Sequence, residues 1–369
     1  MTIIASYDIY GCKVIFADTL ITSQETNENK PILPTLGKID STRINDSFHI
    51  AGNLQKIQIL SDYCVIAYAG SVYLAHQYIT ALNDILKERR LLISDIENIY
   101  NSIDVNNELA IIYLYNSGDE NIISGGLNCV NTLSDVLGDV IYRGSGEQAI
   151  SDYIKWIDDN AEIFRPSPDE VVANGVRIVI EQIAKLQMAE ISSSSTPESI
   201  KDCFGSSYEI VSFYDGKFNK IDLTYAFIEL TYNHKTKNVD INYPYLMLSN
   251  YIEDDFLVHE RYQKNNLDYL VDICLVEYDY NKIFIPSLLK HDEVASNITQ
   301  NNKLNKLNFC CFIFHDKFKH GCEIWQSIVI RSDEPPITIE RYNGGDLYQV
   351  CYSSRVEKQI VNFIEMNYL

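Results

Sequence analysis

The chain has 369 residues, 46% of them hydrophobic, and its 51 acidic against 30 basic residues leave a formal net charge of −21. An acidic surface repels phosphate backbones and anionic lipid, so we expect neither nucleic acid nor a membrane as a partner. The length predicts two domains. Nine cysteines, an odd number, favour reduced thiols in a cytoplasmic protein, and the first residues lack the basic and apolar regions of a secretory signal.

The first 225 residues alternate between predicted strands and predicted helices. Ile3 to Ile9 and Cys12 to Ala17 form a predicted hairpin that ends at Asp18. The polar residues 20–52 predict an insertion of loops or short strands, and apolar residues at every fourth position predict a helix over 72–90. A second hairpin is predicted over 56–68 and a shorter helix over 93–103. The remaining predicted elements are strands over 109–115 and 139–142, helices over 147–157 and 171–188, and a closing hairpin over 208–216. Such an order is typical of a layered α+β domain.

The composition changes after residue 225. Tyrosine and asparagine become frequent, helical periodicity fades, and hairpin patterns dominate, as in Ile337 to Tyr342 followed by Leu347 to Tyr352. A last helix is predicted over 354–366. We therefore expect a second, β-rich α+β domain over 226–369, which serves partner binding or regulation.

The most informative residue is Thr2, directly behind the initiator methionine. Removal of Met1 leaves a residue that carries both a hydroxyl nucleophile and a free α-amine that can act as its base. An α-amine titrates near pH ~7.7–8.0 and a lysine side chain near ~10.4, so only the α-amine is substantially neutral at physiological pH.

Four further positions lie at the ends of predicted elements. Asp18 ends the second strand, Lys56 opens the next strong strand, Gly70 lies at a strand-to-helix junction, and Ser145 lies in a Gly-Ser-Gly turn that enters a helix. Side chains and amides at element ends can converge on one site from separate strands.

These residues and their spacing resemble the β-subunits of the proteasome and the bacterial HslV peptidase, which are N-terminal nucleophile (Ntn) hydrolases. The spacings from Thr2 to Asp18 and from Lys56 to Gly70 fit the family pattern without a gap, and Gly144-Ser145-Gly146 matches its Gly-Ser-Gly turn. The resemblance covers about residues 2–222. It implies a four-layer αββα sandwich for residues 1–225.

The resemblance also implies a mechanism. Thr2 attacks a peptide or amide carbonyl, and its α-amine accepts the proton through water. Lys56, cationic beside Asp18, favours deprotonation of the hydroxyl. The backbone N–H of Gly70 stabilises the oxyanion, and Ser145 orients the α-amine. The chain would then be a threonine-type peptidase or amidase without a cofactor.

The family pattern further implies an acidic residue before a turn, and Asp202 is the candidate that would hold Ser145 and the amine. Gly205 stands where the family has a hydroxyl residue. By the same resemblance, four residues would line the specificity pocket: Ile21, Leu54, Tyr68 and Val72. Because Tyr68 is bulky, we expect a shallow pocket for small or flat apolar side chains.

Other functions stay open at this point. The chain could be a catalytically silent, proteasome-like scaffold whose second domain binds a protein, or an amidase that acts on a small non-peptide amide. The family assembles into rings, so a homo-oligomer is expected, with an ATPase or another regulatory protein as a further partner. We predict no metal site, because one group of residues lacks paired Cys-x-x-Cys spacing: Cys310, Cys311, His315, His320 and Cys322.

Overall fold

A computed structural model gives the structure and describes residues 2–26, 30–39, 41–105, 107–118, 121–161, 166–233, 238–252, 255–264, 275–290, 308–316, 324–332, 336–342 and 346–368. The fold is mixed α+β and contains more strand than helix. It divides into two compact units. The first runs to Lys220 and also includes Tyr251–Leu257 and a segment that begins at Phe284, whereas the second begins at Ile221. From the sequence we expected every residue after 225 to belong to the second domain. The structure differs from this expectation, because two later segments belong to the first unit.

The first unit contains a six-stranded sheet, in which Thr2 directly precedes one strand and Asp18 ends another. In spatial order its strands are β11 (Val130–Ser134), β12 (Gly138–Gly144), β1 (Ile3–Ile9), β2 (Cys12–Asp18), β13 (Tyr208–Tyr214) and β14 (Lys217–Lys220). The β1–β2 hairpin pairs Ile9 with Cys12 and Ile4 with Ala17, which confirms the hairpin predicted at the start of the chain.

A four-stranded sheet packs against the six-stranded one. Its strands, in spatial order, are β10 (Ile122–Leu127), β9 (Leu109–Asn116), β8 (Cys64–Gly70) and β7 (Ile57–Ser61). Side chains alternate between the two faces of a strand. Val65, Ala67 and Ala69 of β8 accordingly join Ile4 and Ile15 in one apolar cluster, so this cluster lies between the two sheets.

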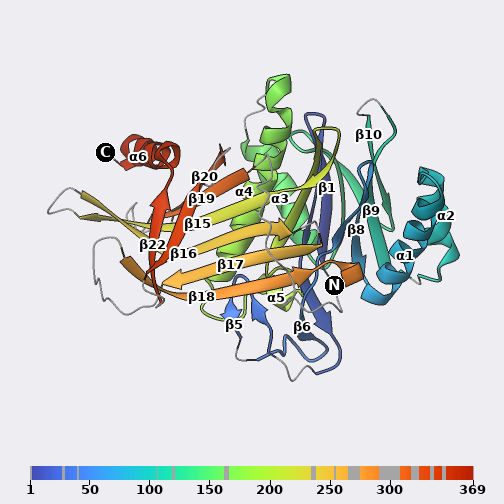
Figure 1. Cartoon of the computed structure of the whole chain (residues 1–369), viewed down its shortest axis with the longest axis horizontal. Helices are drawn as coiled ribbons and strands as arrows, with labels where there is room; N and C mark the ends of the chain where they lie inside the picture. The colour runs from blue at the N-terminus through green and yellow to red at the C-terminus, as the bar shows by residue number, and fades with distance from the viewer. Residues whose placement is uncertain are drawn as a thin grey trace. The chain divides into compact units, whose positions relative to one another are not determined.

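Helices cover the outer faces of both sheets (Figure 1). The alternate residues of β8, including Ile66 and Tyr68, pack with α1 (Val72–Glu88) and α2 (Ile93–Ser102). On the other side, α4 (Val171–Ile191) contacts β2 and β13, and α3 (Glu147–Asn160) contacts β12. Two short helices complete this side: η1 (Pro168–Glu170) and α5 (Glu198–Lys201).

The polar insertion over 20–52 forms short strands, as the sequence predicted. They are β3 (Leu20–Ser23), β4 (Ile32–Leu33), β5 (Gly37–Lys38) and β6 (His49–Asn53), paired as β3–β6 and β4–β5.

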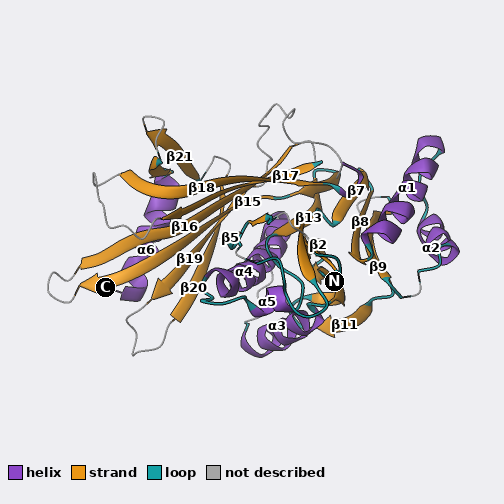
Figure 2. Cartoon of the chain, turned by 90° about the horizontal axis from the view of Figure 1, so that it is seen from below, coloured by secondary structure: helices purple, strands orange, loops and turns teal. Residues whose placement is uncertain are grey.

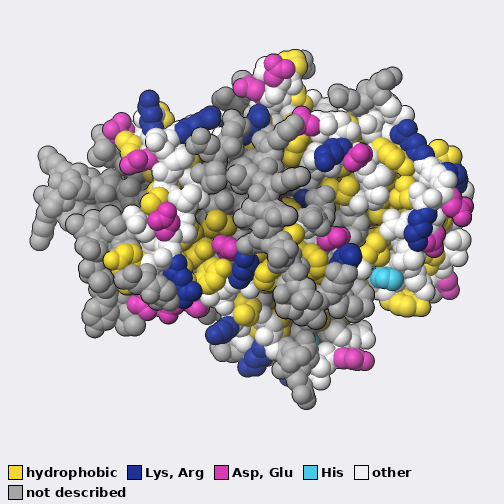
Figure 3. All heavy atoms as spheres, in the orientation of Figure 1, with side chains coloured by type: hydrophobic (Ala, Val, Ile, Leu, Met, Phe, Trp, Pro, Cys, Tyr) yellow, Lys and Arg dark blue, Asp and Glu magenta, His cyan; other side chains and the backbone are white. Residues whose placement is uncertain are grey.

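The outer surface of α1 and α2 carries interspersed basic and acidic side chains (Figure 3), among them the pairs Lys87–Asp84 and Arg89–Asp95.

The second unit is built on an eight-stranded sheet with α6 (Ser354–Tyr368) against one face (Figure 2). Val356 and Ile360 of α6 pack into the core on that face. In spatial order the strands are β20 (Ile324–Ser332), β19 (Asn308–Asp316), β15 (Asp222–Asn233), β16 (Asn238–Ile252), β17 (Phe256–Lys264), β18 (Leu275–Pro286), β22 (Leu347–Tyr352) and β21 (Ile337–Tyr342). The β-rich character expected for this part is confirmed. After β18, η2 (Leu288–Lys290) belongs to the first unit.

Candidate active site

Thr2, Asp18 and Lys56 form one buried hydrogen-bonded group. The Thr2 hydroxyl donates to Asp18 Oδ1, and Lys56 Nζ donates to the Thr2 hydroxyl oxygen. Lys56 Nζ also lies 2.7 Å from Asp18 Oδ1. The exposed fractions are 1% for Thr2, 0% for Asp18 and 3% for Lys56. One buried hydroxyl is therefore held between an ammonium and a carboxylate, both of which are buried as well.

The fold fixes the Asp18 carboxylate through the backbone. Oδ1 accepts from the amide of Ile3 at 2.9 Å, and Oδ2 accepts from the amides of Leu20 at 3.2 Å and Gly205 at 2.9 Å. Because β1 and β2 are hairpin partners, the start of one strand and the end of the other meet at the same edge. Thr2 and Asp18 are thus neighbours although sixteen residues separate them.

The Lys56 ammonium has three acceptors. Besides the Thr2 hydroxyl and the Asp18 carboxylate, Nζ donates to the carbonyl of Leu20 at 2.7 Å. Burial lowers the pKa of the Lys56 ammonium, and the negative charges of Asp18 and Glu209 oppose this shift. The ammonium consequently loses its proton at a lower pH than an exposed lysine does.

The Gly-Ser-Gly turn holds the backbone of Thr2. The Thr2 carbonyl accepts from the Gly146 amide at 3.2 Å and from the Ser145 hydroxyl at 3.3 Å. A side chain at Gly144, whose φ is +120°, would place its Cβ 2.0 Å from the Thr2 carbonyl oxygen. Glycine at 144 therefore allows the turn to approach the nucleophile candidate.

Gly70 and Asp202 are not connected to this group by hydrogen bonds. Gly70 ends β8 with φ +107°, and a Cβ there would lie 1.9 Å from the carbonyl oxygen of Glu108. Asp202 is exposed after α5, and its carboxylate forms no hydrogen bond within the described part of the chain. The Ser145 hydroxyl, expected to pair with Asp202, lies within hydrogen-bonding distance of the carbonyls of Thr2, at 3.3 Å, and Cys203, at 3.4 Å. Ser145 and Asp202 line one cavity of about 400 Å³ without a hydrogen bond between them in the described residues.

The four residues expected to line a specificity pocket share one apolar cluster. Leu54 and Tyr68 are buried in it, and Ile21 and Val72 pack against it half-buried. The Tyr68 hydroxyl donates to the carbonyl of Gln55 at 3.4 Å. Burial raises the pKa of this hydroxyl well above its ordinary value, and the charges of Glu209 and Asp18 add to the shift, so Tyr68 stays protonated.

Sequence reasoning missed a second, deeper set of buried polar residues. Glu209 accepts from the backbone amide of Lys56 at 2.6 Å and pairs with Lys220 at 3.0 Å. Glu190 accepts from the hydroxyls of Thr35 at 2.6 Å and Ser199 at 3.0 Å, among other donors. The available signal was a glutamate inside the apolar run from Tyr208 to Val211, because a charge on a buried strand requires partners.

In comparisons with known proteins, no family model and no curated protein matches this chain.

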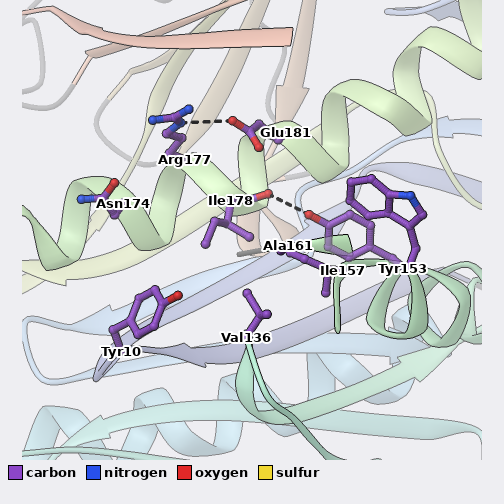
Figure 4. A pocket seen from close by; sticks show the side chains of 10 residues that line it. Tyr10, Val136, Tyr153, Ile157, Ala161, Asn174, Arg177, Ile178 and Glu181 are labelled. Carbon is purple, nitrogen blue, oxygen red and sulfur yellow. Dashed lines mark hydrogen bonds and ion pairs between the residues drawn. The ribbon is translucent and has the colours of Figure 1, made fainter. Parts of the chain in front are cut away.

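One cavity in the described part of the chain lies away from the candidate site. Figure 4 shows a cavity of about 300 Å³ at the other end of β1, where Arg177 pairs with Glu181 and the Tyr153 hydroxyl donates to the Ile178 carbonyl at 3.4 Å. This cavity contains none of the predicted site residues.

No cluster of three or more metal-ligating side chains occurs in the described ranges. Of the Cys/His group, Cys310 and Cys311 are buried in β19, whereas His320 and Cys322 lie outside the described residues. Among the helices that the structure describes, none is long and apolar enough to cross a bilayer.

Proposed function

We propose that this chain is a threonine-type peptidase or amidase of the Ntn-hydrolase class, with Thr2 as the nucleophile after removal of Met1. One observation carries the proposal: the Thr2 hydroxyl lies between the Asp18 carboxylate and the Lys56 ammonium. The two facing sheets with helices outside support an αββα sandwich of the proteasome type.

The proposed reaction has two acyl-transfer steps. The Thr2 oxygen bonds to the substrate carbonyl carbon, and its proton passes through water to the Thr2 α-amine. Collapse of the tetrahedral intermediate breaks the C–N bond, and the departing amine takes up that proton. Water then hydrolyses the resulting ester, and the threonine hydroxyl is regenerated.

The surrounding residues have separate tasks in this proposal. The positive charge of Lys56 lowers the free energy of the developing alkoxide, and Asp18 keeps Lys56 cationic. The turn around Ser145 holds the Thr2 backbone. The Gly70 amide is the proposed oxyanion donor, and such a donor is typically worth ~2.7–4 kcal/mol in the transition state. A ring of identical subunits and an ATPase partner remain proposals that follow from the resemblance.

The direct test compares Thr2→Ala with Thr2→Ser on fluorogenic peptides and on acylated small amines. We expect Thr2→Ala to lose at least about a thousandfold in kcat, because the nucleophile is gone, and Thr2→Ser to keep measurable turnover. Equal hydrolysis by Thr2→Ala and the parent would assign the activity elsewhere.

A catalytically silent scaffold is the second candidate. The burial of Thr2, at 1% exposure, and the exposed position of Asp202 favour it. The scaffold predicts that neither peptides nor small amides are hydrolysed and that Met1 is retained.

A further inference from the structure

A second buried acid–base pair contacts the backbone of Lys56, a residue of the candidate active site. Glu209 on β13 and Lys220 on β14 have side chains that are 0% and 1% exposed, with Lys220 Nζ 3.0 Å from Glu209 Oε1. Among the hydrogen bonds of the described residues, none joins Glu209 to Thr2 or Asp18. The proposed reaction does not use Glu209 or Lys220, so their burial needs another explanation.

Glu209 holds the backbone that carries Lys56. Its Oε2 accepts from the amide of Lys56 at 2.6 Å and from the amide of Ile57 at 3.2 Å. A charged acceptor forms stronger hydrogen bonds than a neutral one. The carboxylate thereby fixes the point where the chain enters β7, which sets the direction of the Lys56 side chain.

Lys220 completes the arrangement from the other side. Its ammonium bonds to Glu209 and to the side-chain carbonyl of Gln55, the residue before Lys56. Gln55 Nε2 in turn donates to the carbonyls of Asp255 and Ile285, each at 2.8 Å. Segments from the later part of the chain are thus hydrogen-bonded to the residue beside Lys56, within the first unit.

A buried ion pair is a poor device for stability alone, because its desolvation penalty can exceed the Coulombic attraction. The Glu209 carboxylate is stabilised by two backbone amides and by the Lys220 ammonium, and at longer range by the charge of Lys56. The charged groups that act on Lys56 are Asp18 from β2 and Glu209 from β13. Both carboxylates also act on the Tyr68 hydroxyl from β8, and Glu209 pairs with the Lys220 ammonium from β14.

We infer that Glu209, supported by Lys220, is a positioning residue for Lys56: it fixes the backbone at Lys56 and places a buried carboxylate beside that residue. This inference rests on the proposed function for the role of Lys56 in turnover. The effect on Lys56 itself is independent of turnover and can be measured separately.

The test follows the titration of Lys56 by NMR, in full-length protein labelled with carbon-13 at the lysine ε-carbons and assigned with Lys56→Arg. The variants are Glu209→Gln, the double variant Glu209→Gln/Lys220→Met, and Tyr7→Phe as a control. Tyr7→Phe removes a buried hydrogen bond of 2.8 Å to Gln182 in the same unit without contact to Lys56.

In Glu209→Gln, Lys56 is expected to titrate at lower pH than in the parent, because a nearby negative charge is lost and the Lys220 ammonium loses its carboxylate partner. The double variant should titrate between these two, since both charges are gone together. Should Glu209→Gln not fold, the double variant still decides. It also removes the carboxylate whose Oε2 accepts from the Lys56 amide, and it removes the Lys220 ammonium that bonds to Oε1 of the same carboxylate. A Lys56 titration equal to the parent's in the folded variants would overturn the inference.

Hydrolysis gives the second readout. Glu209→Gln should lower kcat about tenfold to a hundredfold with KM little changed, and its alkaline limb should move to lower pH. Tyr7→Phe should alter thermal stability and leave both the limb and the Lys56 titration in place. If Thr2→Ala keeps the parent's activity, the proposed function fails, while the NMR titration still tests the action of Glu209 on Lys56.

Discussion

Glu190 should make the stability of the protein fall as the pH rises through neutrality. Its carboxyl group is completely buried near the end of α4. It receives hydrogen bonds from the hydroxyl of Thr35, the hydroxyl of Ser199 and the amide of Ser206. Burial raises the pKa of Glu190 from 4.5 to about 7, and these hydrogen bonds only partly oppose the shift. The perturbation that isolates this group is Glu190→Gln, which keeps the shape and cannot ionise.

The sign follows from proton binding. A raised pKa means that the folded state holds the proton more tightly than the unfolded state does. The contribution to stability is therefore fully present below pH 4.5 and is lost as the pH rises through 7. The rise of the pKa from 4.5 to about 7 corresponds to a loss of about 3 kcal/mol over the full titration, at about 1.36 kcal/mol per pH unit.

Urea unfolding of parent and Glu190→Gln from pH 4 to pH 8 measures this loss. Other titrating groups cancel in the difference between the two free energies of unfolding. The parent should lose about 3 kcal/mol relative to Glu190→Gln across the range. A difference that stays constant with pH would refute the reasoning, since it would mean that Glu190 has the same pKa in both states.

Three further predictions test the site and its support. Gly144→Ala should cost about 3 kcal/mol or more, because the new Cβ meets the Thr2 carbonyl, whereas Gly11→Ala, at φ +89° with open space around it, should cost about 1 kcal/mol; thermal unfolding compares them, and equal losses would contradict the contact. Leu288→Ala should cost about 2–5 kcal/mol, because Leu288 is buried in the cluster with Leu54, and the neighbouring Leu289→Ala, 40% exposed, should stay within about 0.5 kcal/mol in urea unfolding; a reversed order would place η2 elsewhere. Hydrolysis should decline on the alkaline side with a midpoint below 10.5, since burial lowers the pKa of Lys56, and Lys56→Arg should lack this limb; a limb that persists in Lys56→Arg would assign it to another group.

Local patterns predicted those parts of the fold in which neighbours in the sequence are neighbours in space. The β1–β2 hairpin, the short strands of the 20–52 insertion and helix α1 follow from alternation, turn residues and helical periodicity. The meeting of Thr2 with Asp18 follows from that hairpin. The approach of Lys56 depends on two sheets packing together, and it was expected only because the residue spacing resembles a known family.

The other features of the fold and the site depend on contacts between residues far apart in the sequence, which no local sequence pattern predicts. Gln55 reaches backbone carbonyls 200 and 230 residues further along the chain. The loop before β13 places Cys203 and Ser206 at positive φ, 63° and 74°, a conformation that non-glycine side chains disfavour and that the chain must stabilise elsewhere. This loop directs the Gly205 amide to Asp18 and leaves Asp202 exposed, which the family pattern did not predict.

The most direct test of the central claim is intact mass spectrometry before and after reaction with an electrophile selective for an amino-terminal threonine, followed by mapping of the adduct. We predict a chain that lacks Met1 and carries one adduct on Thr2, with no adduct in Thr2→Ala. A chain that retains Met1, or an adduct on any other residue, would contradict it.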